Sequence, residues 1–219
     1  MKIELKNKFV YFLHNKMYIN VTNLCTNNCV FCIRDLNNNV NGTNLRLENE
    51  NFEAKDIIDE IRQNSNEIND EVVFCGYGEP LIKLEIVKEV AKFIKTNYPQ
   101  VAVRINTNGQ ANLIHKRNII PELTGLIDKI SVSLNAETAD LYQQLAQPKF
   151  DKDKAFKGVK DFISGCRKYK IDVTATVVTG FGDYKIDVEK CREIAEKLDA
   201  KFKIRKWLDE GYQVAKPPS

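Results

Sequence analysis

The sequence predicts an α/β fold of six β/α units, arranged as an incomplete (β/α)6 TIM-type barrel or as an open parallel sheet. Short apolar runs alternate along the chain with amphipathic segments, a pattern typical of parallel strands joined by right-handed helical crossovers. The chain has 219 residues, whereas a complete eight-stranded barrel takes about 250. No repeat, Pro- or Gly-rich linker or shift in composition divides it. We therefore expect one domain over residues 1–219.

The individual elements follow from the apolar pattern. Residues 10–13 and 18–21 are expected to pair as a hairpin through residues 14–17, so that residues 1–16 form an N-terminal extension. Residues 36–44 are expected to be a polar loop and residues 208–219 a C-terminal tail. Further strands are expected at residues 72–75, 101–107, 129–134, 171–178 and 202–207. Helical periodicity predicts helices at residues 54–61, 86–94, 111–118, 137–145, 154–169 and 187–198.

Composition excludes several classes of protein. The formal charge is +3, with Lys and Arg spread along the chain, so no nucleic-acid footprint is indicated. No segment approaches the roughly 20 apolar residues of a membrane span, and the N-terminus carries charges where a signal peptide would be apolar. Six cysteines in such a chain favour metal binding, catalysis or buried thiols over disulfides. We therefore expect a cytoplasmic protein.

Unusual motifs follow five of the predicted strands, where parallel α/β folds place their active sites. They are TNLC at residues 22–25, GYGEP at 76–80, TNG at 107–109, SLN at 133–135 and TGFGD at 179–183. Five such motifs on one rim indicate a functional site.

Cys25, Cys29 and Cys32 have the spacing C-x3-C-x2-C, which places three thiolates on one short loop. Structural zinc requires four ligands, usually in two pairs, and no second pair exists; His14 and His115 receive no role. Three thiolates suit a [4Fe–4S] cluster with one iron left open. The alternative is a zinc site completed by Cys75. Cys166 and Cys191 lie on apolar helical faces and are expected in the core.

CTNNCVFC, with an aromatic residue before its last cysteine, and FCGYGEPL resemble the signatures of the radical S-adenosylmethionine (SAM) superfamily. Within it the sequence looks most similar to pyruvate formate-lyase activating enzymes and to small proteins associated with TatD-family hydrolases. The resemblance implies a [4Fe–4S] cluster on the three cysteines and SAM on the open iron. It implies reductive cleavage of SAM to a 5′-deoxyadenosyl radical, which abstracts hydrogen from a substrate, and an electron donor such as flavodoxin or ferredoxin.

The resemblance also implies roles for individual residues. Phe31 would pack near the adenine and shield the cluster, with ordinary core packing as the alternative. Gly76 and Gly78 would allow close backbone approach or positive φ, and Glu79 would receive the SAM ammonium. Asn106 stands where related activating enzymes have an acid, and it would contact the SAM amino group beside Asn108; Asn108-Gly109 is alternatively a simple turn.

Ser133 and Asn135 alternate with apolar residues, so both are expected to face the barrel interior. The resemblance has them reaching the SAM carboxylate and ribose, whereas Asn135 is alternatively the N-cap of the following helix. Thr174 and Thr176 should point the same way. Arg34 is either an electrostatic or substrate residue or a solvated surface arginine.

The substrate stays open at this point. An incomplete barrel has a lateral opening, which related activating enzymes use to admit a protein loop. The resemblance therefore implies either a radical SAM enzyme acting on a small molecule or a glycyl-radical-enzyme activase acting on a protein partner. A zinc-binding interaction module and a simple iron–sulfur electron carrier are the competing classes.

Overall fold

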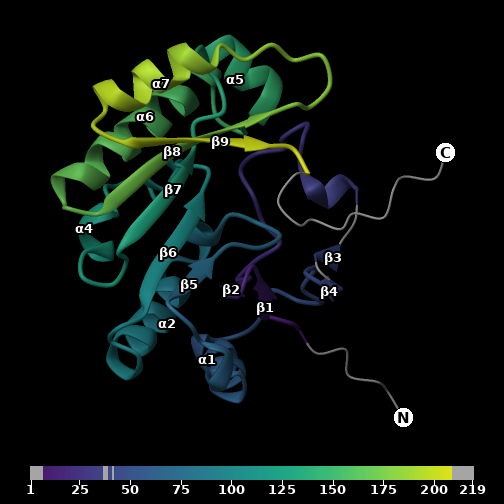
Figure 1. The fold of residues 1–219 in the computed structure, drawn as a ribbon, viewed down its shortest axis with the longest axis vertical. Coiled ribbons are helices and arrows are strands. Elements are labelled where there is room, and N and C mark those ends of the chain that lie inside the picture. Colours follow the sequence, from purple (N-terminus) through teal and green to yellow (C-terminus); the bar gives the residue numbers. More distant parts are fainter. Residues whose placement is uncertain (1–6, 37–38, 41, 209–219) are drawn as a thin grey trace.

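One seven-stranded sheet organises the chain (Figure 1). The computed structural model describes residues 7–36, 39–40 and 42–208. Within them the sheet has the order β1-β2-β5-β6-β7-β8-β9, and every neighbouring pair is parallel except the antiparallel β1–β2 hairpin. The bounds are β1 Val10–Leu13, β2 Lys16–Ile19, β5 Glu71–Phe74, β6 Ala102–Thr107, β7 Lys129–Ser133, β8 Asp172–Thr179 and β9 Lys201–Lys206. The predicted six parallel strands of an α/β fold are confirmed.

Helices connect the parallel strands and lie along the outer side of the curved sheet (Figure 1). Their bounds are α1 Ala54–Gln63, α2 Leu84–Asn97, α3 Ala111–Ile114, α4 Ile120–Leu123, α5 Ala139–Ala146, α6 Lys152–Lys168 and α7 Val188–Lys197. Short 3-10 turns occur at Ile33–Asp35, Ser65–Glu67 and Pro80–Lys83. Among the described helices, none is long and apolar enough to cross a membrane.

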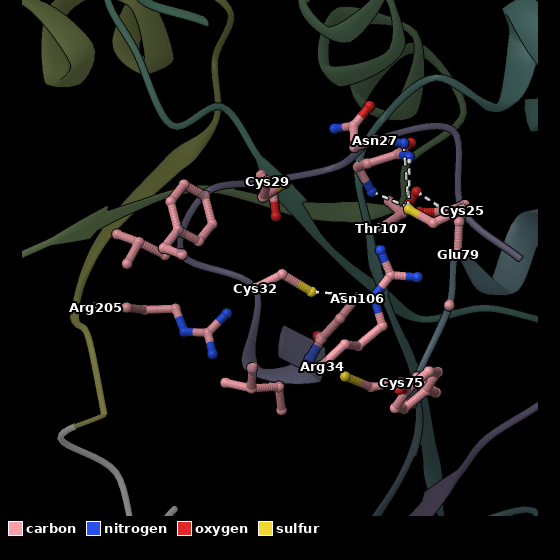
Figure 2. A pocket seen from close by; sticks show the side chains of 18 of the residues that line it. Cys25, Asn27, Cys29, Cys32, Arg34, Cys75, Glu79, Asn106, Thr107 and Arg205 are labelled. Atoms are coloured by element: carbon pink, nitrogen blue, oxygen red, sulfur yellow. Dashed lines mark hydrogen bonds between the residues drawn. The ribbon is translucent and has the colours of Figure 1, made fainter. Parts of the chain in front are cut away.

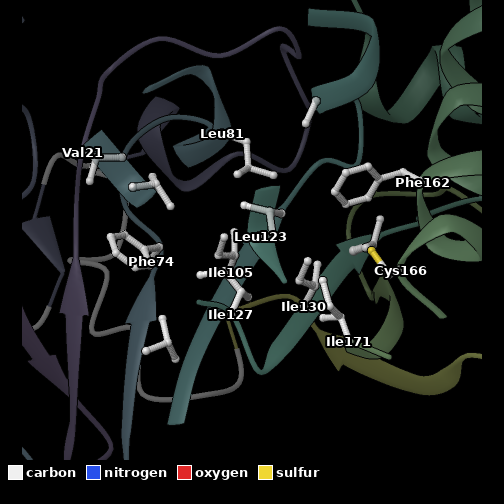
Figure 3. Close-up of a cluster of buried hydrophobic side chains, with 14 of the residues drawn as sticks. Val21, Phe74, Leu81, Ile105, Leu123, Ile127, Ile130, Phe162, Cys166 and Ile171 are labelled. Atoms are coloured by element: carbon white, nitrogen blue, oxygen red, sulfur yellow. The ribbon is translucent and has the colours of Figure 1, made fainter. Parts of the chain in front are cut away.

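The main core lies between the outer face of the sheet and the helices. Ile105 and Ile130, paired across β6 and β7, are buried there against Phe162 of α6 (Figure 3). Cys166 and Cys191 are fully buried, which confirms that both are core residues. The helices therefore cover the outer face of the sheet, and its inner face does not pack against them.

The inner face of the sheet is polar. In β6 the inner residues Arg104 and Asn106 alternate with buried Val103 and Ile105. A complete TIM barrel instead fills its interior with layers of branched apolar side chains. In β6 to β8 the apolar residues face the helices, so this part of the interior is available to polar groups, whereas Tyr18 and Val73 of β2 and β5 belong to a second, smaller apolar cluster.

Some predicted boundaries were wrong. The hairpin turns through His14 and Asn15 alone, both with positive φ, so that Lys16 begins β2. Such a two-residue turn matches the right-handed twist of its strands. A short hairpin of β3 (Asn39–Val40) and β4 (Thr43–Asn44) lies within the expected loop. The short helix α4 was not predicted. Of the terminal segments, residues 1–6 of the extension and 209–219 of the tail lie outside the described residues.

Candidate active site

A cavity opens at the carboxyl ends of β5 to β9, beside the cysteine loop (Figure 2). It collects nearly all residues singled out from the sequence. Cys25, Cys29, Phe31, Cys32, Gly76, Gly78, Glu79, Asn106, Asn108 and Ser133 line it, together with Arg34 and Cys75. Asn135 does not line it. The expectation that strand-end motifs meet at one rim therefore correctly grouped residues more than a hundred positions apart in the sequence.

The cysteine loop is fixed to the C-terminal end of α5. The amide of Asn28 donates to the carbonyl of Ala146, and the amide of Val30 donates to that of Leu145. Within the loop the amide of Cys32 donates to the carbonyl of Cys29 at 2.9 Å. These backbone bonds hold the three thiols on one rim without using their side chains.

Three N–H groups point at the cysteine sulfurs. The amide of Asn27 donates to Cys25 Sγ at 3.4 Å, and Asn108 Nδ2 donates to the same sulfur at 3.9 Å. Arg34 Nε donates to Cys32 Sγ at 3.2 Å, and its guanidinium lies 5.6 Å from the Tyr77 ring centroid. Arg34 is therefore a half-buried residue of the site, not a solvated surface arginine. Such donors stabilise negative charge on sulfur.

The three thiols do not converge as ligands of one ion. Within the described residues, no group of three Cys, His, Asp or Glu side chains is placed to hold a single metal ion. A soft set of three thiolates around a cavity suits an iron–sulfur cluster.

Burial keeps two of the thiols, Cys25 and Cys29, in the neutral form. Burial, with smaller effects from Cys32 and Cys25, raises the pKa of Cys29 to about 12. Burial also raises the pKa of Cys25, with the nearby charge of Glu79 adding to the effect. Both side chains are therefore neutral thiols at pH 7 until a cationic centre stabilises the thiolates.

The two glycines of GYGEP let this loop pack closely against the segment before Cys25. A Cβ at Gly78 would lie 2.3 Å from the carbonyl oxygen of Leu24, and one at Gly76 would lie 2.2 Å from Asn20 Oδ1. Neither glycine has positive φ, so that alternative was wrong. Gly78 is therefore explained by close approach to the backbone of residues 22–24, and Gly76 by close approach to the side chain of Asn20.

Glu79 joins the ends of β5 and β6. Its side chain is buried, and Oε1 accepts from Thr107 Oγ1 at 2.8 Å and from the Leu81 amide at 3.0 Å. Oε2 accepts from the Asn108 amide at 2.7 Å. Burial raises its pKa to about 7, although these hydrogen bonds lower it. The Glu79 side chain thus links the ends of β5 and β6 through hydrogen bonds and also lines the cavity.

Asn106 is oriented by a charged neighbour. Its Oδ1 accepts from Arg104, which also pairs with Glu71 Oε2 at 3.2 Å. Because the Asn106 amide is uncharged, it does not compete with Glu71 for the charge of Arg104. The amide nitrogen of Asn106 can still donate hydrogen bonds.

Comparison with known proteins decides the family. Residues 19–198 match the family model of the Radical SAM superfamily. The chain belongs to the radical SAM superfamily. Membership implies a [4Fe–4S] cluster and SAM as cofactors, and it implies that the chain is an enzyme.

The relatives found are distant. An uncharacterised protein of Methanocaldococcus jannaschii is 26% identical over 119 residues, which are 54% of this chain and 38% of that protein. Streptococcus suis SuiB bound to its precursor peptide SuiA has a TM-score of 0.62 at 16% identity and covers 92% of this chain. TYW1 with a lysine-pyruvate adduct has a TM-score of 0.59 at 16% identity over 92% of this chain. The matched parts are 42% of the SuiB chain and 67% of the TYW1 chain, and these likenesses show the fold.

The residues present fit the radical SAM cofactors. Beyond the three thiols, Asn27 lines the cavity with its Oδ1 buried and without a hydrogen-bond partner among the described residues. An orphaned buried acceptor is rare and indicates a missing donor. A ligand ammonium or hydroxyl is such a donor, so the cavity offers SAM an unused polar contact.

An aromatic wall closes one side of this radical SAM site. Trp207 Nε1 donates to the carbonyl of Phe31 at 3.1 Å, and Phe181 packs against both rings. Phe181 lies within the TGFGD motif singled out from the sequence, but no role was assigned to it, and Trp207 was not predicted as a site residue. Trp207 directly follows the last strand, so the strand-end rule already contained the signal. Arg205, near the end of the same strand, also lines the cavity and was likewise not predicted.

Ser133 and Asn135 separate in the structure. Ser133 faces the cavity as expected, whereas Asn135 is buried beside it with φ of 59° and its Oδ1 unpartnered among the described residues. The N-cap alternative for Asn135 was wrong, because Thr138 caps α5 by accepting from the Leu141 amide.

Proposed function

We propose that Cys25, Cys29 and Cys32 hold a [4Fe–4S] cluster with one open iron, and that the chain is a radical SAM enzyme acting on a substrate inside its incomplete barrel. The observation that carries the proposal is a single cavity lined by the three cysteines, the GYGEP loop and the inner ends of β6 and β7. When bound, the cluster and SAM supply a 5′-deoxyadenosyl radical that abstracts hydrogen from the substrate.

The chain's own residues bind and orient these groups. The Asn27 amide, Arg34 and Asn108 would donate to cluster sulfurs and so set its potential. Glu79 and the free acceptor of Asn27 would take the SAM ammonium.

The remaining predicted contacts complete the SAM site. Gly76 and Gly78 would position the backbone beside SAM, Asn106 would donate to its amino-acid group, and Ser133 would contact its carboxylate or ribose, whereas Asn135 does not line the cavity. Phe31, held by Trp207, would cover the adenine and exclude water.

Substrate and subgroup are proposed more broadly. The resemblance to pyruvate formate-lyase activating enzymes and TatD-associated proteins favours a compact enzyme reduced by flavodoxin or ferredoxin in the cytoplasm. SuiB and anSMEcpe were each solved with a peptide bound. A peptide or protein loop, as for a glycyl-radical-enzyme activase, is therefore the second candidate substrate beside a small molecule.

Anaerobic reconstitution tests the ligand assignment. Cys29→Ala should fail to retain iron, whereas Cys191→Ala, which removes a buried thiol from α7, should bind as much iron as the unmodified protein. Cys75→Ala should also retain the cluster. Full iron content in Cys29→Ala, or its loss in Cys75→Ala, would show that the ligands are misassigned.

A further inference from the structure

The inner face of the sheet carries a continuous band of polar side chains. Paired residues of parallel strands face the same side, so the register places Tyr18, Arg104 and Lys129 in one row. Asn106, Ser131 and Thr174 form the next row, followed by Ser133, Thr176 and Lys203, and finally Val178 and Arg205. This face is the interior of the incomplete barrel.

A second cavity, ≈ 220 Å³ in volume, lies within this interior. Tyr18, Arg104, Ser131, Thr176 and Lys203 are among the residues that line it. Asn106 and Arg205 line both this cavity and the cofactor cavity. The two cavities therefore adjoin, and a molecule in the inner one lies next to the site where hydrogen abstraction would start.

The charge of the interior is strongly positive. Lys16, Arg104 and Lys129 all pair with one carboxylate, Glu71, whose side chain is 5% exposed. Asp172 is already paired with Lys201. Two further cations of β9, Lys203 and Arg205, also line the cavity.

The side chain of Arg205 has no hydrogen bond or ion pair with any other described residue, although its backbone belongs to the β8–β9 ladder. It is only partly exposed, and Figure 2 shows it reaching toward Cys32 from the opposite side of the cavity. A half-buried guanidinium without a counter-charge is unfavourable unless an anion completes it. Its planar fork suits the oxygens of phosphate or carboxylate.

We propose that the inner cavity binds the phosphate or carboxylate group of a small substrate, with Arg205 as the principal cation and Ser131 and Asn106 as further donors. This rests on the proposed function, because the adjoining cofactor cavity is what makes the bound molecule a substrate. The cationic interior thereby selects anionic small molecules and holds them by the charged end.

Calorimetry on the reconstituted holoenzyme tests the proposal. Inorganic phosphate and succinate are titrated separately, without SAM, at constant ionic strength, so that the stronger binder distinguishes a phosphate from a carboxylate substrate. One of them should bind at a single site. Arg205→Gln should weaken that binding about 10- to 100-fold, as expected for a charged hydrogen bond. Arg205→Lys should recover part of the loss, and Ser131→Ala should weaken binding by a smaller factor.

The matched control is Arg46→Gln, which removes the same charge from an exposed position outside the barrel. It should leave anion binding unchanged; equal weakening would mean that only general surface charge attracts the anion. The absence of single-site binding of both anions would also overturn the proposal.

A parallel electron paramagnetic resonance (EPR) measurement separates the two proposals. The reduced cluster of Arg205→Gln should still respond to SAM. If it does not, Arg205 belongs to the cofactor site and the substrate assignment is wrong. If the unmodified protein shows no response to SAM while phosphate binding persists, the proposed function fails and the anion site stands.

Discussion

Gly78→Ala tests how the GYGEP loop positions the cysteine loop. The added Cβ would lie 2.3 Å from the carbonyl oxygen of Leu24 and 2.6 Å from that of Thr22, where ordinary contact begins at 3.4 Å. Both atoms belong to the backbone, so the two segments must separate by about 1 Å. Overpacking of this kind costs about 1–3 kcal/mol, which in a domain of this size lowers Tm by about 2–4 °C per kcal/mol.

The displaced segment leads directly into Cys25. The amide of Glu79 donates to the carbonyl of Leu24 at 2.8 Å, so the same shift also strains the bond that ties the two loops together. We expect Gly78→Ala to fold, with a Tm lower by about 5 °C on the same relation, and to retain less than half of the iron of the unmodified protein after anaerobic reconstitution.

Gly125→Ala is the control. Gly125 has φ of 79° and no atom within 4 Å of an added Cβ, so alanine costs roughly 1–2 kcal/mol of backbone strain without moving the cysteine loop. Thermal unfolding should show a similar loss of Tm in both variants, while iron analysis separates them. If Gly78→Ala retains full iron, the contact does not position the cluster ligands and the reasoning is refuted.

Two further predictions concern the charges and the aromatic wall. Burial raises the pKa of Glu71, but hydrogen bonds from Lys16 and Lys129 and the charge of Arg104 lower it to about 2. The stability that this carboxylate contributes is present above its unfolded pKa of about 4.3 and is lost as pH falls toward 2. Denaturant unfolding should therefore give Glu71→Gln a free energy of unfolding about 2 kcal/mol lower at pH 7, and a weaker dependence of that free energy on pH in this window. The same pH dependence in both proteins would contradict the prediction. Trp207→Phe removes the hydrogen bond to Phe31, so absorbance near 400 nm should bleach several-fold faster in air, and an unchanged rate would show that this wall does not shield the cluster.

The sheet could be predicted because its apolar residues obey one simple rule. In β6 to β8 every second residue is apolar and faces the helices, so strand positions followed directly from alternation. The cysteine loop followed from spacing, and the strand-end rule placed the GYGEP loop beside it. What failed were local turns, such as the hairpin at His14 and Asn15, where adjacent residues of positive φ leave no apolar signal.

The roles of individual side chains were harder to predict, because they depend on partners distant in sequence. Glu79 is committed to Thr107 and Asn108, and no sequence pattern announces that pairing. Asn is a favoured N-cap residue, yet the N-cap of α5 is Thr138 and not Asn135. The anion-binding role inferred for Arg205 likewise depends on the fold, because one cavity brings β9 together with β2 and β6, which are distant in the sequence.

EPR spectroscopy of the reduced, reconstituted protein tests the central claim most directly. If Cys25, Cys29 and Cys32 hold a [4Fe–4S] cluster with one open iron, adding SAM at low temperature should change the g values of its signal, and Cys29→Ala should show no such signal. A reduced cluster whose spectrum is identical with and without SAM would contradict the account.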